Sequence, residues 1–404
     1  MRSFLPSLVA TTLALSAFAC GAGDTPRTNG GSDEIVDVPQ SSVKNQSISN
    51  CWLYATMGWA ESLHVATGEA QLDISESYLT YWHWFDQLVW DGAPGKTAID
   101  ETGYFHQGLD LVYRFGLVKE ADFAAVGQSA AKSKMDRSMR EGALKDEAAR
   151  KDKALVRREL DAAFGLSPEL VEKMNAVFGE GYDRSLDQPG TMPAGTPIRR
   201  AQEIPILAAS ASGGPPRRAT LADAIGDRAW DEGWGLRKGP LSWNELDYPS
   251  DPAQRRAFQI RIQKALHARQ PVVISWFIDF NAMNGSAFKA PPQRPGRQGG
   301  HVTVLEDYQI NDVPGFGTLK AGVNETRADA LTAALDPRAS IEFFRTKNSW
   351  GLTGGPSQDF AGYLDLYTAY LHGPVKKCDR PEGGGEEVCV DHQPFWRAAL
   401  PQGF

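Results

Sequence analysis

Apolar side chains recur at helical spacing in the first third of the chain. Residues 51–65 contain no proline and repeat a large or β-branched side chain every three or four positions. This spacing predicts a helix that begins at Cys51. Residues 103–118 repeat the same pattern, and Gly116 is placed to end that helix.

An aromatic segment between these two predicts another helix, over residues 73–88. Tyr78, Tyr81, Trp82 and Phe85 fall on one face, which is typical of a helix packed in a core. Either Asp73 or Ser75 is suited to cap its N-terminus, because both side chains carry an oxygen that accepts from backbone N–H groups.

The second half of the chain changes to the alternating pattern of β-strands. A predicted helix over residues 252–268 is followed by three β-like segments, at 271–280, 301–310 and 341–350. Helices in the first half and strands in the second predict an α+β fold, with a helical layer against an antiparallel sheet and a cleft between them.

The middle of the chain differs from both halves. Residues 127–175 are rich in charges of both signs and in helix formers, which predicts solvated helices. Residues 181–220 are rich in proline, glycine and serine, which predicts an irregular connection. We therefore expect a helical and Pro/Gly-rich insertion at about 127–240.

Composition and the N-terminal segment indicate an exported protein. The chain has 404 residues, 42% of them hydrophobic, and a net charge of −8 without a basic run, which argues against a nucleic-acid partner. Residues 1–19 are predicted to be a signal peptide and residues 20–42 a flexible tether. "SAFAC" resembles a lipobox, which would lipidate Cys20 and anchor the chain to a bacterial membrane, and this is the favoured prediction. "AFA" alone would also suit an ordinary signal peptidase, and hence a secreted or periplasmic protein.

Four cysteines remain to be assigned in an oxidising compartment. Cys378 and Cys389 flank a Gly-rich turn and are expected to form a local disulfide. With Cys20 in the tether, Cys51 is left as a free thiol where a polar loop becomes a helix. A helix N-terminus stabilises a thiolate, so Cys51 is a candidate nucleophile. In the alternative, Cys51 pairs with one of the other two, which leaves one cysteine unexplained.

A cysteine nucleophile needs a base and a group that orients the base. Among seven histidines, His301 stands out, because "RQGGHVTVLEDY" places it behind two glycines at the start of an apolar strand. "RTKNSWG" places Asn348 at the end of another strand. The asparagine oxygen can accept the imidazole N–H, and the indole of Trp350 can keep water from that bond.

These motifs resemble those of the papain-like cysteine peptidases. The order Cys, His, Asn is accompanied by "NQ", "CW", "GGHV" and "KNSWG". "DISESYLTYW" and the helix before "FGLV" look more like the bleomycin hydrolase and aminopeptidase C branch. The resemblance covers residues 43–120 and 255–370. It implies a papain-like two-lobed fold over residues 43–404, in which a helical lobe with the cysteine helix packs against an antiparallel β lobe.

The resemblance also implies a role for each motif residue. The roles are Cys51 as nucleophile, His301 as acid and base, Asn348 as orienting group, Gln46 as oxyanion donor and Trp350 as shield. Two departures stand out. Four residues rather than five separate Gln46 from Cys51, so Asn45 is an alternative donor. Forty-six residues separate His301 from Asn348, which implies an insertion that reshapes one wall of the cleft.

Residues and resemblance together predict an exported thiol-dependent peptidase that acts on peptides or proteins through an acyl-enzyme. No metal or cofactor is expected, because no HExxH, CxxC or phosphate-binding loop is present. Two rivals remain: a catalytically inactive papain-fold binding protein, and an acyltransferase of the transglutaminase type, which would favour aspartate at position 348. No oligomeric state is predicted.

Two expectations concern the ends of the chain. The polar residues 21–42 cannot form an inhibitory helical prosegment, so none is expected to be removed on activation. The apolar C-terminal segment "HQPFWRAALPQGF" is expected to dock, either in the cleft, where it would restrict cleavage to chain ends, or on the outer surface of the sheet.

Overall fold

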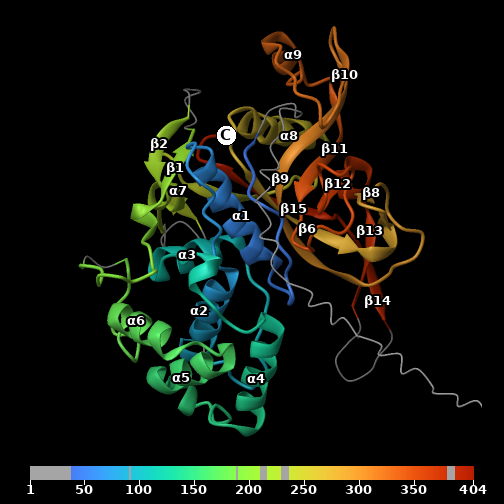
Figure 1. Cartoon of the computed structure of the whole chain (residues 1–404). Coiled ribbons are helices and arrows are strands. Elements are labelled where there is room, and N and C mark those ends of the chain that lie inside the picture. The colour runs from blue at the N-terminus through green and yellow to red at the C-terminus, as the bar shows by residue number, and fades with distance from the viewer. Residues whose placement is uncertain (1–37, 91, 188–189, 210–215, 229–235, 380–386) are drawn as a thin grey trace, which may run out of the picture.

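The computed structural model describes residues 38–90, 92–187, 190–209, 216–228, 236–379 and 387–404. The predicted signal peptide and Cys20 lie outside these residues. Within them, helices gather in one lobe and strands in another, as Figure 1 shows. The expected α+β architecture, with a helical lobe against a largely antiparallel β lobe, is confirmed.

Six helices build the helical lobe of the described chain. They are α1 (Cys51–Val65), α2 (Glu76–Val89), α3 (Phe105–Phe115), α4 (Gln128–Glu141), α5 (Lys153–Phe164) and α6 (Pro168–Phe178). α1 has the predicted bounds, whereas α2 begins three residues later than predicted and α3 is shorter than predicted at both ends. Ser75 rather than Asp73 caps α2, because its hydroxyl accepts from the backbone N–H of Tyr78. α3 ends at Gly116, whose φ of 71° suits glycine.

Nine strands form the main sheet of the described residues. Their bounds are β5 (Trp243–Asp247), β15 (Phe395–Pro401), β6 (Val272–Asp279), β9 (Gln298–Val313), β11 (Ser340–Lys347), β12 (Tyr363–Tyr367), β8 (Ala287–Phe288) and β7 (Met283–Asn284) in sheet order, with β10 (Gly317–Leu319) beside β9. Neighbours are antiparallel except β12 and β8, which pair in parallel. The three predicted strands are β6, β9 and β11.

Shorter elements connect and flank the two lobes. They are β1 (Pro205–Ala208), β2 (Arg217–Thr220), β3 (Asp227–Arg228), β4 (Arg237–Lys238), β13 (Val375–Asp379), β14 (Val388–His392), α7 (Leu221–Ile225), α8 (Pro252–His267), α9 (Ala328–Ala333), α10 (Thr368–Leu371), η1 (Glu120–Asp122), η2 (Ala149–Lys151), η3 (Ala201–Glu203) and η4 (Phe280–Ala282). None of the described helices is both long and apolar enough to span a bilayer.

α1 lies between the two lobes and packs against β9 and β6. Nearly all of its side chains are buried, as expected for a helix enclosed on all sides. Alternate residues of β9 serve different cores: Val302 and Val304 pack with the helical lobe, whereas Leu305 packs in the β lobe. The sheet therefore holds the start of α1 against the strand that carries His301.

The mixed-charge helices are not simply solvated, which corrects that prediction. α4, α5 and α6 each bury one face in the helical core, where Phe164 contacts Tyr81 and Phe178 contacts Trp82. Arg157 is 1% exposed, lies over the Trp82 ring and donates to the Gly179 carbonyl at 2.6 Å. The many charged residues in these helices hide their buried face from an analysis of composition.

The connection after α6 also contains more regular structure than its composition predicts. β1 and β2 form an antiparallel pair, and β1 packs against α1. The insertion between His301 and Asn348 extends β9 into a hairpin with β10 and adds α9, at the top of Figure 1. None of its described residues lines the main cavity, so the expected reshaping of a cleft wall is wrong.

The C-terminal segment forms a strand in the sheet. β15 pairs with β5 on one side and β6 on the other, and it buries Phe395, Ala398 and Leu400. Gln393, Phe395 and Trp396 nevertheless line the main cavity. The tail therefore neither blocks the cleft as a free end nor covers the outer surface of the sheet: it is a core strand whose start forms one cleft wall.

Candidate active site

Cys51 is the first residue of α1 and the free cysteine of the described chain. The preceding Asn50 fixes this loop–helix junction, because its side-chain amide donates to Thr80 at 3.1 Å and to Gln128 at 3.0 Å. The thiol is 8% exposed. The unpaired N–H groups of the first helical turn favour negative charge at this position.

His301 and Asn348 lie side by side on neighbouring strands, although 47 positions separate them in the chain. His301 is in β9, and Asn348 directly follows β11. The imidazole Nε2 is 2.8 Å from the Asn348 side-chain oxygen, and both side chains are buried. Because Nε2 is engaged there, Nδ1 is the ring nitrogen left to exchange a proton with another group.

Two indoles enclose the imidazole. Trp350 stacks on His301 with ring centroids 4.8 Å apart and an interplanar angle of 24°. Trp276, opposite His301 in β6, meets it edge-on at 5.6 Å. Large apolar surfaces on both sides limit the access of water to the His301–Asn348 hydrogen bond, which strengthens it.

Cys51, His301, Gln46 and Trp350 line one cavity of about 1200 Å³ between the lobes. Burial raises the pKa of the Cys51 thiol to about 11, although the backbone amide of Val302 partly opposes this by hydrogen bonding. Val302 directly follows His301, so the thiol lies beside the strand that carries the imidazole.

Burial also lowers the pKa of His301 to about 4, and the Asn348 hydrogen bond opposes this only in part. Each charged form is therefore unfavourable alone. Transfer of the thiol proton to the imidazole creates both charges together, however, and their mutual attraction is strong in a site shielded from water.

Gln46 is better placed than Asn45 to donate into the cavity. Gln46 is half-buried and lines the cavity, whereas Asn45 is exposed and forms a bridge with Trp350. The Gln46 side-chain oxygen accepts from the Ser349 hydroxyl, and its Nε2 donates to the Ile48 carbonyl at 2.9 Å. An amide nitrogen carries two hydrogens, so one remains for a bound oxyanion.

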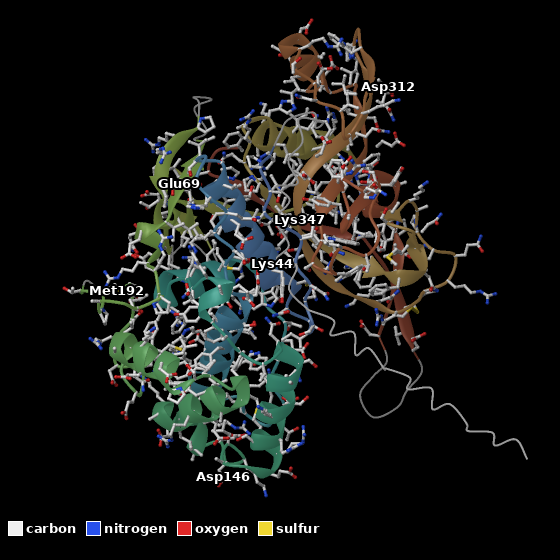
Figure 2. All side chains as sticks on the ribbon, in the orientation of Figure 1. Lys44, Glu69, Asp146, Met192, Asp312 and Lys347 are labelled. Atoms are coloured by element: carbon white, nitrogen blue, oxygen red, sulfur yellow. A yellow bond between two sulfur atoms is a disulfide. The ribbon has the colours of Figure 1, made fainter. Side chains whose placement is uncertain are left out.

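Buried charges lie directly behind the site, and the sequence prediction did not find them. Lys44 pairs with Glu61 of α1 at 2.8 Å and with Glu76 of α2 at 2.9 Å. Lys347, the residue before Asn348, donates to the Ser41 hydroxyl at 2.5 Å, and that hydroxyl in turn donates to Glu61. Figure 2 shows Lys44 and Lys347 in the centre of the molecule. This network joins α1 to the end of β11.

Glu76→Gln tests this network through the pH dependence of stability. Burial raises the pKa of Glu76 to about 7, from 4.5, although Lys44 opposes the shift. The folded chain then holds a proton that the unfolded chain has lost, so the wild type loses stability as pH rises from 4.5 to 7, and the glutamine variant does not. We therefore expect the unfolding free energy of the variant, relative to that of the wild type, to increase by about 1–3 kcal/mol as the pH rises through this range.

The measurement is urea unfolding of both proteins at pH 5 and pH 7.5. Glu172→Gln, at an exposed position of α6, is the matched control and should show no such shift. A constant difference between wild type and Glu76→Gln at the two pH values would contradict the assigned role of Glu76.

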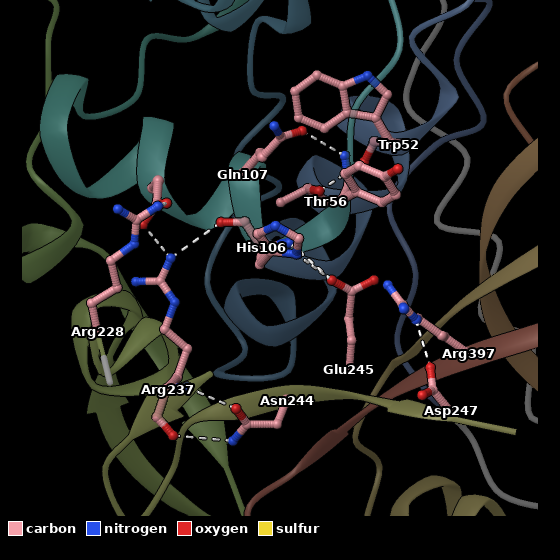
Figure 3. Close-up of polar contacts among 12 residues, drawn as sticks. Trp52, Thr56, His106, Gln107, Arg228, Arg237, Asn244, Glu245, Asp247 and Arg397 are labelled. Atoms are coloured by element: carbon pink, nitrogen blue, oxygen red, sulfur yellow. Dashed lines mark hydrogen bonds and ion pairs between the residues drawn. The ribbon is translucent and has the colours of Figure 1, made fainter. Parts of the chain in front are cut away.

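A second polar cluster ties α3 to β5 of the main sheet, as Figure 3 shows. His106 Nδ1 lies 2.6 Å from a Glu245 carboxylate oxygen of β5, and Asp110 pairs with both Arg228 and Arg237. The sequence around His106 does not indicate this contact, because the partner Glu245 is 139 positions away in the chain. The cluster fixes α3, and thereby the cavity-lining residues that precede it.

The predicted disulfide is present, joining Cys378 and Cys389 at facing positions of β13 and β14. These cysteines and Glu387 form the group of potential metal ligands found in the described residues. Because both sulfurs are in the disulfide, they are not available as thiolate ligands.

Comparisons with known proteins find likeness at the level of structure alone. No family model and no curated protein sequence matches the chain. Xylellain, a cysteine protease from Xylella fastidiosa, is 11% identical over 90% of this chain and 84% of its own, with a TM-score of 0.39. The cysteine protease and lectin-like domains of Cwp84 from Clostridium difficile are 11% identical over 89% and 48%, with a TM-score of 0.34.

A structure describing the mite allergens Blo t 1 and Der p 1 is 13% identical over 89% of this chain and 67% of its own, with a TM-score of 0.35. None of these three is described as a bleomycin hydrolase or aminopeptidase C, so that branch stays a prediction.

Proposed function

We propose that the chain is a thiol-dependent peptidase, with Cys51 as nucleophile, His301 as acid and base, and Asn348 as the group that orients His301. One observation carries the proposal: the His301–Asn348 hydrogen bond of 2.8 Å, shielded by Trp350, lies in the same cavity as a thiol at a helix N-terminus. A buried histidine held by an asparagine leaves one nitrogen for proton transfer, as a cysteine nucleophile requires.

The reaction divides into acylation and deacylation. The Cys51 proton moves to His301 Nδ1, and the sulfur attacks the peptide carbonyl. The second Gln46 Nε2 hydrogen and the Cys51 backbone N–H stabilise the oxyanion; losing such a donor costs about 10²–10³ in rate. His301 then protonates the leaving amine as the C–N bond breaks. A water, deprotonated by His301, attacks the thioester and releases the acid and the thiol.

The presence of all three groups, Cys51, His301 and Asn348, favours this proposal over its two rivals. An inactive binding scaffold has no need for a free thiol beside an oriented imidazole. A transglutaminase-type acyltransferase would favour a carboxylate where Asn348 stands. The Cys378–Cys389 disulfide supports export to an oxidising compartment. Lipidation at Cys20 remains a proposal that rests on the sequence motif.

His301→Ala tests the thiol–imidazole pair. Without the imidazole, the Cys51 thiol has no proton acceptor, and a pKa of about 11 leaves roughly one molecule in 10⁴ ionised at pH 7. We expect iodoacetamide to alkylate Cys51 at least 100-fold more slowly in the variant than in the wild type at pH 6.5. Peptide mapping by mass spectrometry measures the rate at this residue.

His267→Ala is the matched control, since His267 is half-buried, bonds to Tyr308 and does not line the cavity. Its alkylation rate should stay close to that of the wild type. Equal rates in the wild type and His301→Ala would contradict the proposed pair.

A further inference from the structure

Four planar groups form a continuous stack along one wall of the cavity. Trp350 stacks on His301 at 4.8 Å, Phe280 stacks on Trp350 at 5.6 Å and 25°, and the Arg297 guanidinium lies 4.2 Å from the centre of the Phe280 ring. All four line the cavity. The stack thus extends from His301, the proposed acid and base, to the positive charge of Arg297.

The backbone holds this arginine in place. The Arg297 carbonyl accepts from the Phe280 N–H at 3.0 Å. The next residue, Gln298, donates from its side chain to Asp279 at 2.7 Å and to the Lys376 carbonyl at 2.6 Å. Arg297 is therefore fixed at its backbone and held at its guanidinium by the Phe280 ring, which lowers the entropy that it loses on binding a ligand.

The charge of Arg297 is unmatched within the described residues. Its side chain is exposed to the cavity, and no described carboxylate pairs with it. By contrast, the other cavity-lining arginine, Arg397, pairs with Asp247 at 2.7 Å. The chain as a whole carries a net charge of −8. An unpaired guanidinium in its cleft is therefore a local positive charge, which attracts anions.

The stack also fixes which half of a substrate would meet this charge. The proposed mechanism has His301 protonate the leaving amine, so the leaving half of the peptide lies on the imidazole side of the cleft. An extended peptide advances about 3.3–3.6 Å per residue. A leaving segment of a few residues is therefore long enough to bring a carboxylate to Arg297.

We propose that Arg297 binds a carboxylate on the leaving side of the substrate, so that peptides with a negative charge within about four residues after the cleaved bond are preferred. The carboxylate belongs either to an Asp or Glu side chain or to the C-terminus of the peptide. This inference rests on the proposed peptidase function.

The test measures kcat/KM for matched peptides that carry Glu or Gln at each of the four positions after the cleaved bond, with a free or an amidated C-terminus. The wild type should prefer the charged member of a pair by about 10-fold, which is typical of one charge-assisted hydrogen bond. In Arg297→Gln the ratio should fall to about 1. Because each ratio compares two peptides on one preparation, it does not depend on the fraction of active enzyme.

Arg397→Gln is the control and should keep the ratio of the wild type, since its charge is already paired. A preference confined to free C-termini assigns the carboxylate to the chain end; one confined to Glu peptides assigns it to a side chain. Equal rates on all peptides with an active wild type would overturn this inference and leave the peptidase function intact. Cleavage of none of them, with Cys51 inert to thiol reagents, would overturn both.

Discussion

Cys51→Ala should lose peptide hydrolysis by about 10⁴-fold or more, because the sulfur forms the covalent bond to the acyl group and no other described group can replace it. The fold should survive. The thiol is in the first turn of α1 at the edge of the cavity, so its removal enlarges a space that is already open. Steady-state hydrolysis and thermal unfolding of both proteins measure the two effects.

Ser49→Ala is the matched control, because Ser49 lines the same cavity two positions earlier. Its rate should stay within a few-fold of the wild type. Full activity in Cys51→Ala would refute the assignment of the nucleophile, and an unfolded Cys51→Ala protein would refute the claim that this thiol has no structural role.

Removing residues 394–404 should abolish folding instead of altering the mode of cleavage. The deletion removes β15 from between β5 and β6, together with the buried Phe395 and Leu400. Each large buried side chain contributes about 3–5 kcal/mol, and the lost backbone hydrogen bonds add to this. The total is comparable to the whole stability of a typical domain, about 5–15 kcal/mol.

Circular dichroism and thermal unfolding measure this outcome, and a chain shortened only by Gln402–Phe404 is the control. Those three residues follow β15, so their loss should lower the melting temperature by only about a few degrees. A folded protein lacking residues 394–404 that cleaves blocked peptides would contradict the role of β15 and restore the earlier idea of a tail that restricts the cleft.

The sequence predicted those parts of the fold that depend on local periodicity. α1, α2 and α3 were found because each repeats apolar side chains at helical spacing, and α3 in addition ends at Gly116. β6, β9 and β11 were found because each is rich in β-branched and aromatic side chains. β15 was not, because "PFWRAALP" contains a proline at each end and an arginine, and its strand character depends on partners far away in the chain.

The same limit applies to the site. The motifs around Cys51, His301 and Asn348 predicted which residues to examine, and the fold brings His301 and Asn348 within hydrogen-bonding distance. Their catalytic roles remain predictions. Lys347 was overlooked, although it belongs to "KNSWG", because the sequence does not show that its ammonium group is buried beside Ser41. Pairings across hundreds of positions leave no local pattern.

Labelling with a thiol-directed epoxide inhibitor of cysteine peptidases tests the central claim most directly. The wild type is titrated with the inhibitor while residual hydrolysis is recorded, and intact-mass and peptide-mapping spectrometry locate the adduct. The account predicts one adduct per chain, on Cys51, with activity falling in proportion to labelling and with no adduct in Cys51→Ala. A folded wild-type protein that takes no label at Cys51, or that keeps full activity when Cys51 is labelled, would contradict it.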